Sequence, residues 1–327
     1  MRNFWKTLQK PVFVLAPMAD VTDAAFRRII AQHGKPDVTW TEFVSADGLH
    51  FADEVGKAKL MRDLIFTDAE RPIVAQFFTA RPETMREAAV LAHTLGFDGV
   101  DINMGCPDKS IEKQGAGAAM IKNPQLAREI IRAAKEGAQD IPVSVKTRIG
   151  FNKDELEAWL PELLAEHPAL ITVHARTRKE MSKVPARWER VARAVEIRDS
   201  VQAHLPKEER TLILGNGDAL SIDDAHEKVR ATGCDGVMLG RAIFGNPWLF
   251  APEQHPDIPA RLLVMVEHTE LFEKLLGDIK SFAIMKKHYK AYVHGWDGAK
   301  ELRETLMEAQ NASEVRGIVE KYLQTRA

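Results

Sequence analysis

The sequence predicts an α/β fold, a (β/α)8 TIM barrel, followed by a small all-helical C-terminal domain. Eight short apolar runs are spaced through the first three quarters of the 327 residues, with helical patterns between them. The runs are continuous rather than alternating, which suits parallel strands that are buried on both faces. After residue 250 the strand signals stop and only helical periodicity remains.

Each expected strand is short and leads into a turn. In chain order the strands are Val12–Met18, Thr39–Ser45, Ile73–Phe78, Gly99–Gly105, Pro142–Ile149, Leu170–Arg176, Thr211–Gly217 and Gly236–Arg241. Eight βα units followed by a change of pattern favour a closed barrel over an open sheet.

Helical periodicity and capping signals lie between the strands. The expected helices are Asp23–His33, Pro82–Leu95, Pro124–Lys135, Asp154–Glu166 and a segment between Ser221 and Gly233. Residues Phe51–Phe66 are less regular and are expected to leave the barrel. We therefore expect a barrel domain at 1–250, a proline-containing linker at 251–259 and a helical domain at 260–327.

Composition excludes some classes of protein. A formal net charge of -2 gives no global basic character, although a local basic face is still compatible with it. Two cysteines, Cys106 and Cys234, are too few for a disulfide framework and fit a reducing compartment. No signal peptide or membrane-spanning run is recognised. We therefore expect a cytoplasmic protein without a membrane partner, and no stable protein partner is implied.

Cys106 is the main candidate for chemistry because it directly follows the fourth expected strand. Barrel enzymes keep catalytic groups at the carboxyl ends of their strands. A thiol of ordinary pKa is mostly protonated at neutral pH, so it can donate a proton or act as a nucleophile. Lys109 and Lys113 are expected to lower its pKa, and Asp108 to oppose them. A small apolar filler is the alternative at this position, and Cys234 is expected to be structural.

The loop Pro107–Gly117 is long for a connection between a strand and a helix, and it could act as a mobile lid. Its segment Gly115-Ala116-Gly117 only half resembles a dinucleotide-binding fingerprint. The third glycine is missing and the segment lies in the fourth unit, so we discount it.

Polar side chains end several other apolar strands. They are Gln76, Lys146, His174 and Arg176. A single residue of this kind is more often a satisfied core group, but the carboxyl ends of barrel strands converge on one mouth. The four are therefore expected to share a site.

The seventh and eighth strands end in Gly215-Asn216-Gly217-Asp218 and Leu239-Gly240-Arg241. Barrels often bind a phosphate here through loop amides, and Arg241 would add positive charge. Tight turns with a surface arginine are the alternative. One phosphate site suits a mononucleotide cofactor such as FMN better than a dinucleotide.

The C-terminal region contains a basic-aromatic segment, Lys286–His294, in which lysines and histidines alternate with Tyr289 and Tyr292. RNA is often held by cations on its phosphates and by rings on its bases, and Lys286 and Lys287 are the candidate cations. A solvated helix face with two packed tyrosines explains the same pattern. The sequence leaves both interpretations open.

Seven segments together form a specific pattern. They are Leu15–Asp23, Thr41–Val44, Asp101–Pro107, Val145–Arg148, Val173–Thr177, Gly215–Asp218 and Met238–Arg241. In this order they resemble the tRNA-dihydrouridine synthases, and the resemblance runs over nearly the whole chain. It implies an FMN-dependent barrel with a helical RNA-binding domain, in which NADPH reduces FMN and the C5–C6 double bond of a uridine in RNA is then reduced.

The resemblance also implies roles for individual residues. Cys106 would donate the proton to C5 after hydride adds to C6. The implied cofactor contacts are Pro17, Met18, Ala19, Gln76, Lys146, His174, Asn216, Gly217, Asp218, Gly240 and Arg241. The implied substrate contacts are Asn103, Arg148 and Arg176, to which the basic-aromatic segment adds Lys286 and Lys287.

One segment, Lys179–Trp188, departs from the family pattern. This departure bears on the choice of the target uridine and leaves the expectation of a flavin unchanged. Three other interpretations are open. They are a flavin barrel acting on a free small molecule, as in the dihydroorotate dehydrogenase type, a Schiff-base aldolase using Lys146, and a non-catalytic RNA-binding protein. The sequence does not decide between transfer and ribosomal RNA, and the choice of NADPH comes from the resemblance alone.

Overall fold

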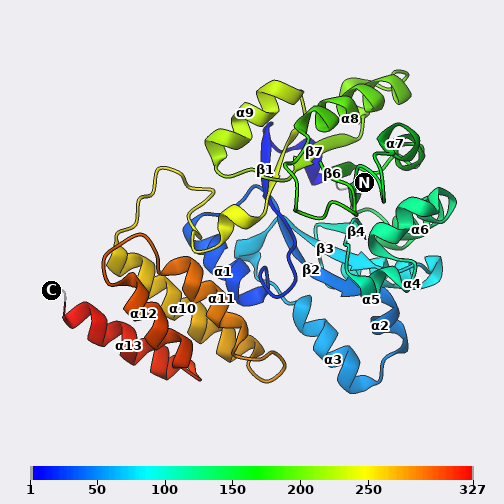
Figure 1. The fold of residues 1–327 in the computed structure, drawn as a ribbon. Coiled ribbons are helices and arrows are strands. Elements are labelled where there is room, and N and C mark those ends of the chain that lie inside the picture. The colour runs from blue at the N-terminus through cyan, green and yellow to red at the C-terminus, as the bar shows by residue number, and fades with distance from the viewer. Residues whose placement is uncertain (1–2, 326–327) are drawn as a thin grey trace.

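Eight parallel strands form the barrel that the sequence predicts (Figure 1). The structure, a computed structural model, describes residues 3–325, and residues 1–2 and 326–327 of the expected domains lie outside the described residues. The strands are β1 (Val12–Leu15), β2 (Thr39–Ser45), β3 (Ile73–Phe78), β4 (Gly99–Met104), β5 (Val143–Arg148), β6 (Leu170–His174), β7 (Leu212–Asn216) and β8 (Gly236–Leu239). They pair in the order β1-β8-β7-β6-β5-β4-β3-β2, and a parallel bridge between Val14 and Val38 closes the sheet beside β2.

Helices follow the strands and cover the outside of the barrel (Figure 1). The outer helices are α1 (Ala24–His33), α4 (Pro82–Thr94), α6 (Pro124–Ala138), α7 (Leu156–Leu164), α8 (Trp188–Val201) and α9 (Ile222–Thr232). The capping signals act as expected: the Asp23 carboxylate accepts the N–H of Phe26 at 3.0 Å, and Gly233 ends α9 with φ 68°. Shorter pieces are α5 (Lys109–Glu112) and the 3₁₀ helices η1 (Phe4–Lys6), η2 (Asp68–Glu70), η3 (Gly117–Lys122), η4 (Lys207–Glu209) and η5 (Arg241–Ile243).

The first strand is shorter than expected. β1 ends at Leu15 because Met18 begins a turn, in which its carbonyl accepts hydrogen bonds from the N–H groups of Val21 at 3.1 Å and Thr22 at 3.0 Å. Residues 16–18 therefore leave the sheet and lie at the rim of the barrel. The irregular segment Phe51–Phe66 begins at the last residue of α2 (Ala46–Phe51) and contains α3 (Glu54–Asp63), so it is mostly helical.

The inside of the barrel is packed with side chains. Val14, Val74, Leu214 and other apolar residues of the strands form this inner core. At the amino end, Trp5 of η1 packs against Trp40, with ring centroids 5.7 Å apart. Trp5 therefore covers part of the inner core at the amino end of the barrel.

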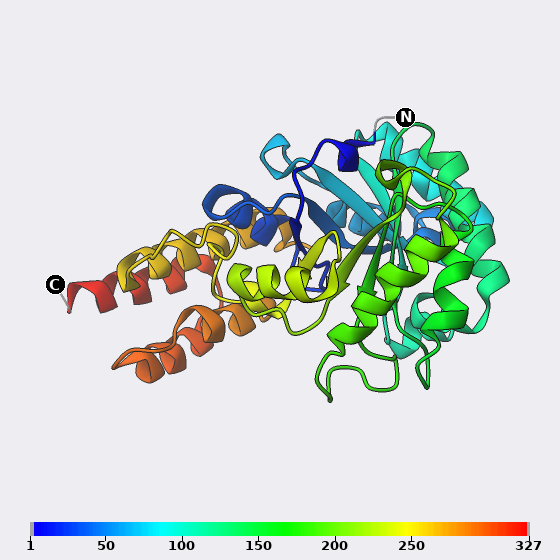
Figure 2. The ribbon, with the colours of Figure 1, turned by 90° about the horizontal axis from the view of Figure 1, so that it is seen from above.

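Four helices form the C-terminal region, which projects from the side of the barrel (Figure 2). They are α10 (Ile258–Leu276), α11 (Ile284–Tyr292), α12 (Ala299–Glu308) and α13 (Ala312–Gln324). Phe26 of α1 joins the two parts, because its ring centroid lies 4.7 Å from that of His268 and 5.0 Å from that of His288. Within residues 3–325, no helix combines the length and apolar character needed to cross a membrane.

Candidate active site

A cavity of about 540 Å³ opens at the carboxyl end of the barrel, where the ends of several strands meet. Ten residues singled out in the sequence line it: Pro17, Met18, Lys146, His174, Arg176, Asn216, Gly217, Asp218, Gly240 and Arg241. Small-molecule sites usually enclose roughly 300–1,000 Å³. The structure therefore brings most of the candidate cofactor residues to one place of suitable size.

The sheet register aligns the polar residues of adjacent strands. Asn103 of β4 lies opposite Lys146 of β5, and Arg148 lies opposite His174 of β6. His174 in turn lies opposite Asn216 of β7. Lys146 Nζ donates to Asn216 Oδ1 at 3.3 Å, so the polar side chains contact one another across the mouth.

The cavity carries positive charge. Burial, and after it the neighbouring Arg148, lowers the pKa of Lys146 to about 8, so this amine is still mostly protonated at neutral pH. Burial also lowers the pKa of His174 well below its ordinary value, and four nearby cations add to the effect. These cations are Arg148, Lys146, Arg176 and Arg241. A neutral histidine among four cations indicates a place that favours an anionic ligand.

Asp218 organises the wall formed by β7 and β8. Its carboxylate accepts hydrogen bonds from Arg176, from Arg241 Nη2 at 2.6 Å and from the N–H of Ala186 at 2.9 Å. The hydrogen bond from Arg176 is the largest cause of a pKa below the ordinary range for Asp218. Its neighbour Gly217 has φ 120°, which favours glycine and leaves the backbone accessible. The Asp218 carboxylate thus holds two arginines at the cavity.

Beside the cavity, a chain of amide hydrogen bonds leads to Cys106. Gln76 Nε2 donates to Asp101 Oδ2 at 2.6 Å, and Asn103 Nδ2 donates to Gln76 Oε1 at 3.1 Å. Asn103 Oδ1 accepts the N–H of Cys106 at 2.9 Å. Burial raises the pKa of Asp101 to about 6, although a hydrogen bond from Ser144 opposes this. Asp101 was not among the expected site residues, although an acid within a buried strand, two residues before Asn103, was an available signal.

The electrostatic environment of Cys106 differs from the expected one. Burial of this partly buried thiol is the dominant effect and raises its pKa above the ordinary value. Lys146 and Arg148 are the cations that oppose this rise, whereas Lys109 and Lys113 of the same loop are not among its main causes. The expectation that the loop lysines lower the thiol pKa is therefore wrong, and Cys106 keeps its proton at neutral pH.

The loop Pro107–Gly117 is folded and tied to the barrel. It forms α5, and Glu112 of this helix is in an ion pair with Arg178 of the loop after β6. At the end of the loop, Gly117 has φ 60°, and a Cβ there would lie 2.8 Å from the carbonyl oxygen of Cys106. Glycine is therefore needed for this close approach.

Arg148 donates to backbone carbonyls, whereas Arg176 donates both to a backbone carbonyl and to the Asp218 carboxylate. Arg148 Nε bonds the carbonyl of Gly105 at 2.7 Å, and Arg176 Nε bonds that of Val184 at 2.6 Å. Both side chains are buried. They shape the loops on either side of the mouth, and their assignment as substrate contacts stays a prediction.

Comparison with known proteins identifies the family. Residues 14–327 match the family model described as dihydrouridine synthase. The chain belongs to the dihydrouridine synthase family. A probable tRNA-dihydrouridine synthase of Staphylococcus aureus (strain COL) is 39% identical over 323 residues, which cover 98% of this chain and 95% of that protein. A probable tRNA-dihydrouridine synthase 2 of Bacillus subtilis (strain 168) is 38% identical, with coverage of 98% and 96%. The family resemblance expected from the sequence motifs is thus confirmed, and membership of this family makes the protein a flavin-dependent oxidoreductase.

Solved structures with similar folds are more distant in sequence. Morphinone reductase superposes with a TM-score of 0.52 at 14% identity, covering 78% of this chain and 90% of that one. 2-Naphthoyl-CoA reductase superposes with a TM-score of 0.53 at 12% identity, covering 73% of this chain and 49% of that one. At these identities the likeness concerns the fold alone, and it agrees with the barrel.

The mouth of this dihydrouridine synthase family member fits a flavin. Pro17 and Met18 provide an apolar wall for a ring system, and Lys146 provides a buried cation. Next to them, the end of β8 offers Arg241 and the backbone of Gly240, where a Cβ would lie 3.6 Å from Ala16 Cβ and 3.7 Å from Met18 Sδ. The residues present therefore suit both an isoalloxazine ring and a phosphate.

The remaining candidates of this family member lie outside the cavity. Ala19 is exposed beside Met18 at the rim, and Lys286 and Lys287 lie on α11. Tyr289 and Tyr292 of the same helix are fully buried, as is His288. Tyr289 and Tyr292 therefore cannot stack on bases, because other helices cover their rings, whereas contacts of Lys286 and Lys287 with RNA phosphates stay a prediction.

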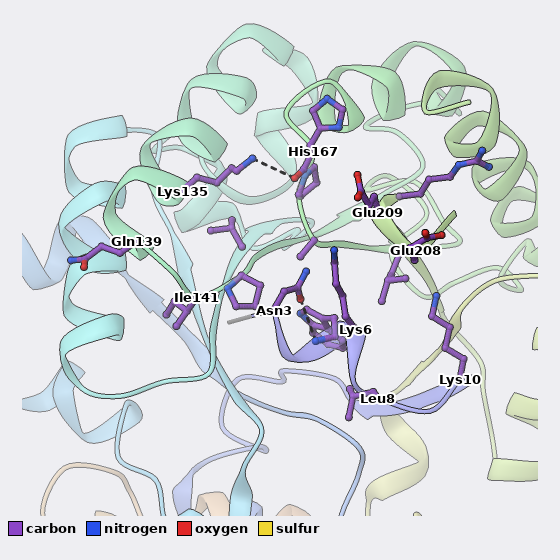
Figure 3. A pocket seen from close by; sticks show the side chains of 17 residues that line it. Asn3, Lys6, Leu8, Lys10, Lys135, Gln139, Ile141, His167, Glu208 and Glu209 are labelled. Atoms are coloured by element: carbon purple, nitrogen blue, oxygen red, sulfur yellow. Dashed lines mark hydrogen bonds between the residues drawn. The ribbon is translucent and has the colours of Figure 1, made fainter. Parts of the chain in front are cut away.

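A second hollow, of about 440 Å³, lies at the amino end of the barrel (Figure 3). Lys135 and Lys10 contribute to its wall, but Lys135 Nζ is 3.0 Å from the carbonyl of Glu166 and Lys10 Nζ is 2.7 Å from Asp235. None of the candidate residues lines it. The chemistry expected from the sequence thus belongs to the opposite end of the molecule.

Proposed function

We propose that this protein reduces the C5–C6 double bond of specific uridines in tRNA to dihydrouridine, with FMN as the bound cofactor and NADPH as the electron donor. Family membership supports the reaction, and one observation of the site carries its details. A protonated thiol, Cys106, lies on the loop after β4, beside a positively charged cavity. A reaction on tRNA would place the protein in the cytoplasm.

In this proposal the cavity residues hold FMN, together with Ala19 and Gln76, which do not line the cavity. Asn216, Gly217, Asp218, Gly240 and Arg241 would hold its phosphate. Pro17, Met18, Ala19, Gln76, Lys146 and His174 would lie along its ring, with Lys146 near the pyrimidine edge. When bound, FMN supplies the hydride that adds to C6 of the uracil.

Cys106 would then donate its proton to C5. A group that acts as a general acid must carry its proton at the working pH, and the raised pKa of this thiol meets that condition. Asn103, which holds the backbone of Cys106, would contact the uracil. The target base must leave its stack to reach this point, which takes a few kcal/mol of unstacking.

An anaerobic experiment tests the proposal. The FMN-loaded protein is reduced with NADPH, and the flavin absorbance is followed after addition of unmodified tRNA, with ribosomal RNA and free uridine in parallel samples. We expect reoxidation by tRNA alone. Reoxidation by ribosomal RNA would indicate that ribosomal RNA rather than tRNA is the substrate. Reoxidation by free uridine would favour a small-molecule reductase. A flavin that no RNA reoxidises would contradict the proposal.

Lys286 and Lys287 should contribute to tRNA affinity. Neither side-chain amine has a hydrogen-bond or ion-pair partner among residues 3–325, so both are available to phosphates. We expect Lys286→Glu with Lys287→Glu to weaken tRNA binding and to reduce the slope of log affinity against log salt by about 2. The matched control is Lys6→Glu with Lys207→Glu, an equal charge change at the amino end of the barrel. An unchanged salt slope would show that these lysines do not contact phosphates.

A further inference from the structure

Lys280 lies between the helical region and the mouth of the barrel. It follows α10 in a turn, where its N–H donates to the carbonyl of Leu276 at 2.8 Å. Its Nζ lies 2.7 Å from Glu42 Oε2 and 3.2 Å from Asp63 Oδ1. A third carboxylate, that of Asp20, lies 3.6 Å away. The side chains of Lys280 and Glu42 are only 13% and 6% exposed, so water screens this contact weakly.

Glu42 links Lys280 to the first loop of the barrel, which follows β1. Its other carboxylate oxygen accepts the N–H of Asp20. Asp20 is the second central residue of the turn Met18–Val21 and has φ 54°, a conformation that favours glycine or asparagine at this position. A non-glycine residue keeps such a conformation when its surroundings hold it there. Glu42, held by Lys280, is one group that does so.

The turn is continuous with the wall of the cavity. Residues 16–18 precede or begin the turn, and all three line the cavity assigned to the flavin. The segment directly before Lys280 is fixed to the barrel, since Arg62 of α3 donates to the carbonyl of Leu275 at 2.7 Å and to the carboxylate of Asp278 at 2.6 Å. A lysine surrounded by three carboxylates is not available to RNA phosphates, so its role differs from that of Lys286 and Lys287.

We propose that Lys280 is a positioning residue for the flavin pocket: through Glu42 it holds the Met18–Val21 turn and thereby the wall formed by residues 16–18. The helical region then completes a site that the barrel strands build. This inference rests on the proposed function, because it takes the cavity at the mouth as the flavin site.

The test measures FMN binding rather than turnover. The full-length apoprotein is titrated with FMN, and the quenching of flavin fluorescence gives the dissociation constant. We expect Lys280→Met to raise this constant at least tenfold, which corresponds to about 1.4 kcal/mol. Lys280→Arg should stay close to the wild type. Lys290→Met, an exposed lysine of the same region, is the matched control and should change nothing. An unchanged constant in Lys280→Met would overturn the inference.

A rescue variant separates positioning from a general loss of structure. Glycine adopts the conformation of residue 20 without strain, so Asp20→Gly should restore FMN affinity in the Lys280→Met background. Failure to restore it in a folded double variant would overturn the route through the turn. If Lys280→Met does not fold, Glu42→Gln is compared with Glu42→Leu, because only glutamine can still accept the N–H of Asp20. Equal FMN affinities in these two variants would also overturn the inference, whereas a wild type that does not bind FMN would contradict the proposed function instead.

Discussion

Replacing Cys106 by alanine should remove most uridine reduction while FMN and tRNA binding stay intact. Positioned general acids usually contribute a factor of roughly 100 to 10,000 to the rate, and we expect a loss of this size. The thiol lies outside the residues that line the flavin cavity, so its removal leaves cofactor binding unchanged. Single-turnover oxidation of the reduced flavin by tRNA measures the rate, and equilibrium titrations measure the two affinities.

The second cysteine provides the matched control. Cys234 is buried, and its Sγ donates to the carbonyl of Gly236 at 3.2 Å, a bond that serine can keep. Cys234→Ser should therefore react like the wild type. Near wild-type turnover in Cys106→Ala would rule out the proton-donor role.

The same assignment predicts a pH dependence. The pKa of Cys106 lies above the ordinary thiol value because of burial, so the acid form persists through neutral pH. The rate of the proton-transfer step should be constant there and should fall only as alkaline pH removes the proton. A rate that rises with deprotonation of Cys106 would contradict a general acid.

Replacing Arg27 by methionine should strongly destabilise the fold. Arg27 of α1 and Glu70 of η2 form an ion pair at 2.8 Å, and both side chains are completely buried. Arg27 also donates to the carbonyls of Thr22 at 2.9 Å and Ile65 at 2.6 Å. Removal of one partner of a buried pair leaves an uncompensated charge, which costs about 3–5 kcal/mol. Denaturant unfolding, monitored by circular dichroism, measures this change as a lower midpoint.

Two further variants show whether burial is the cause. Arg193 and Glu196 form an exposed ion pair at 2.7 Å, so Arg193→Met should leave the unfolding midpoint nearly unchanged. Glu70→Gln in the Arg27→Met background removes the unpaired charge and should recover part of the stability. Equal effects of Arg27→Met and Arg193→Met would show that the buried pair contributes no more than a surface pair.

Much of the fold could be predicted from local patterns. The strands β2 and β3 have the expected bounds, Thr39–Ser45 and Ile73–Phe78, because a continuous apolar run ends where a turn must begin. β1 was expected to reach Met18, but the turn at that residue depends on Thr22 and on Glu42, which lies far away in the sequence. A contact of that kind leaves no periodic signal in either segment.

In the site, too, some features could be predicted from local sequence and others could not. Parallel strands direct the residues at their carboxyl ends to one mouth, so the meeting of Lys146, His174 and Asn216 was predictable from their positions alone. The hydrogen-bond and ion-pair partners of each side chain could not be predicted in this way. The buried state of Tyr289, like the carboxylates around Lys280, depends on how α10 and α11 pack against the barrel.

The amino-acid sequence by itself determined the family, the order of strands and helices, and the residues available for chemistry, because these follow from motifs and from the period of apolar positions. Only the tertiary structure decided the direction in which the pKa of Cys106 shifts and the hydrogen bonds of Arg148, and it also joined Lys280 to the loop beside the cavity. Burial and electrostatic interaction depend on distances in space, and those distances arise only when segments remote in the chain come together.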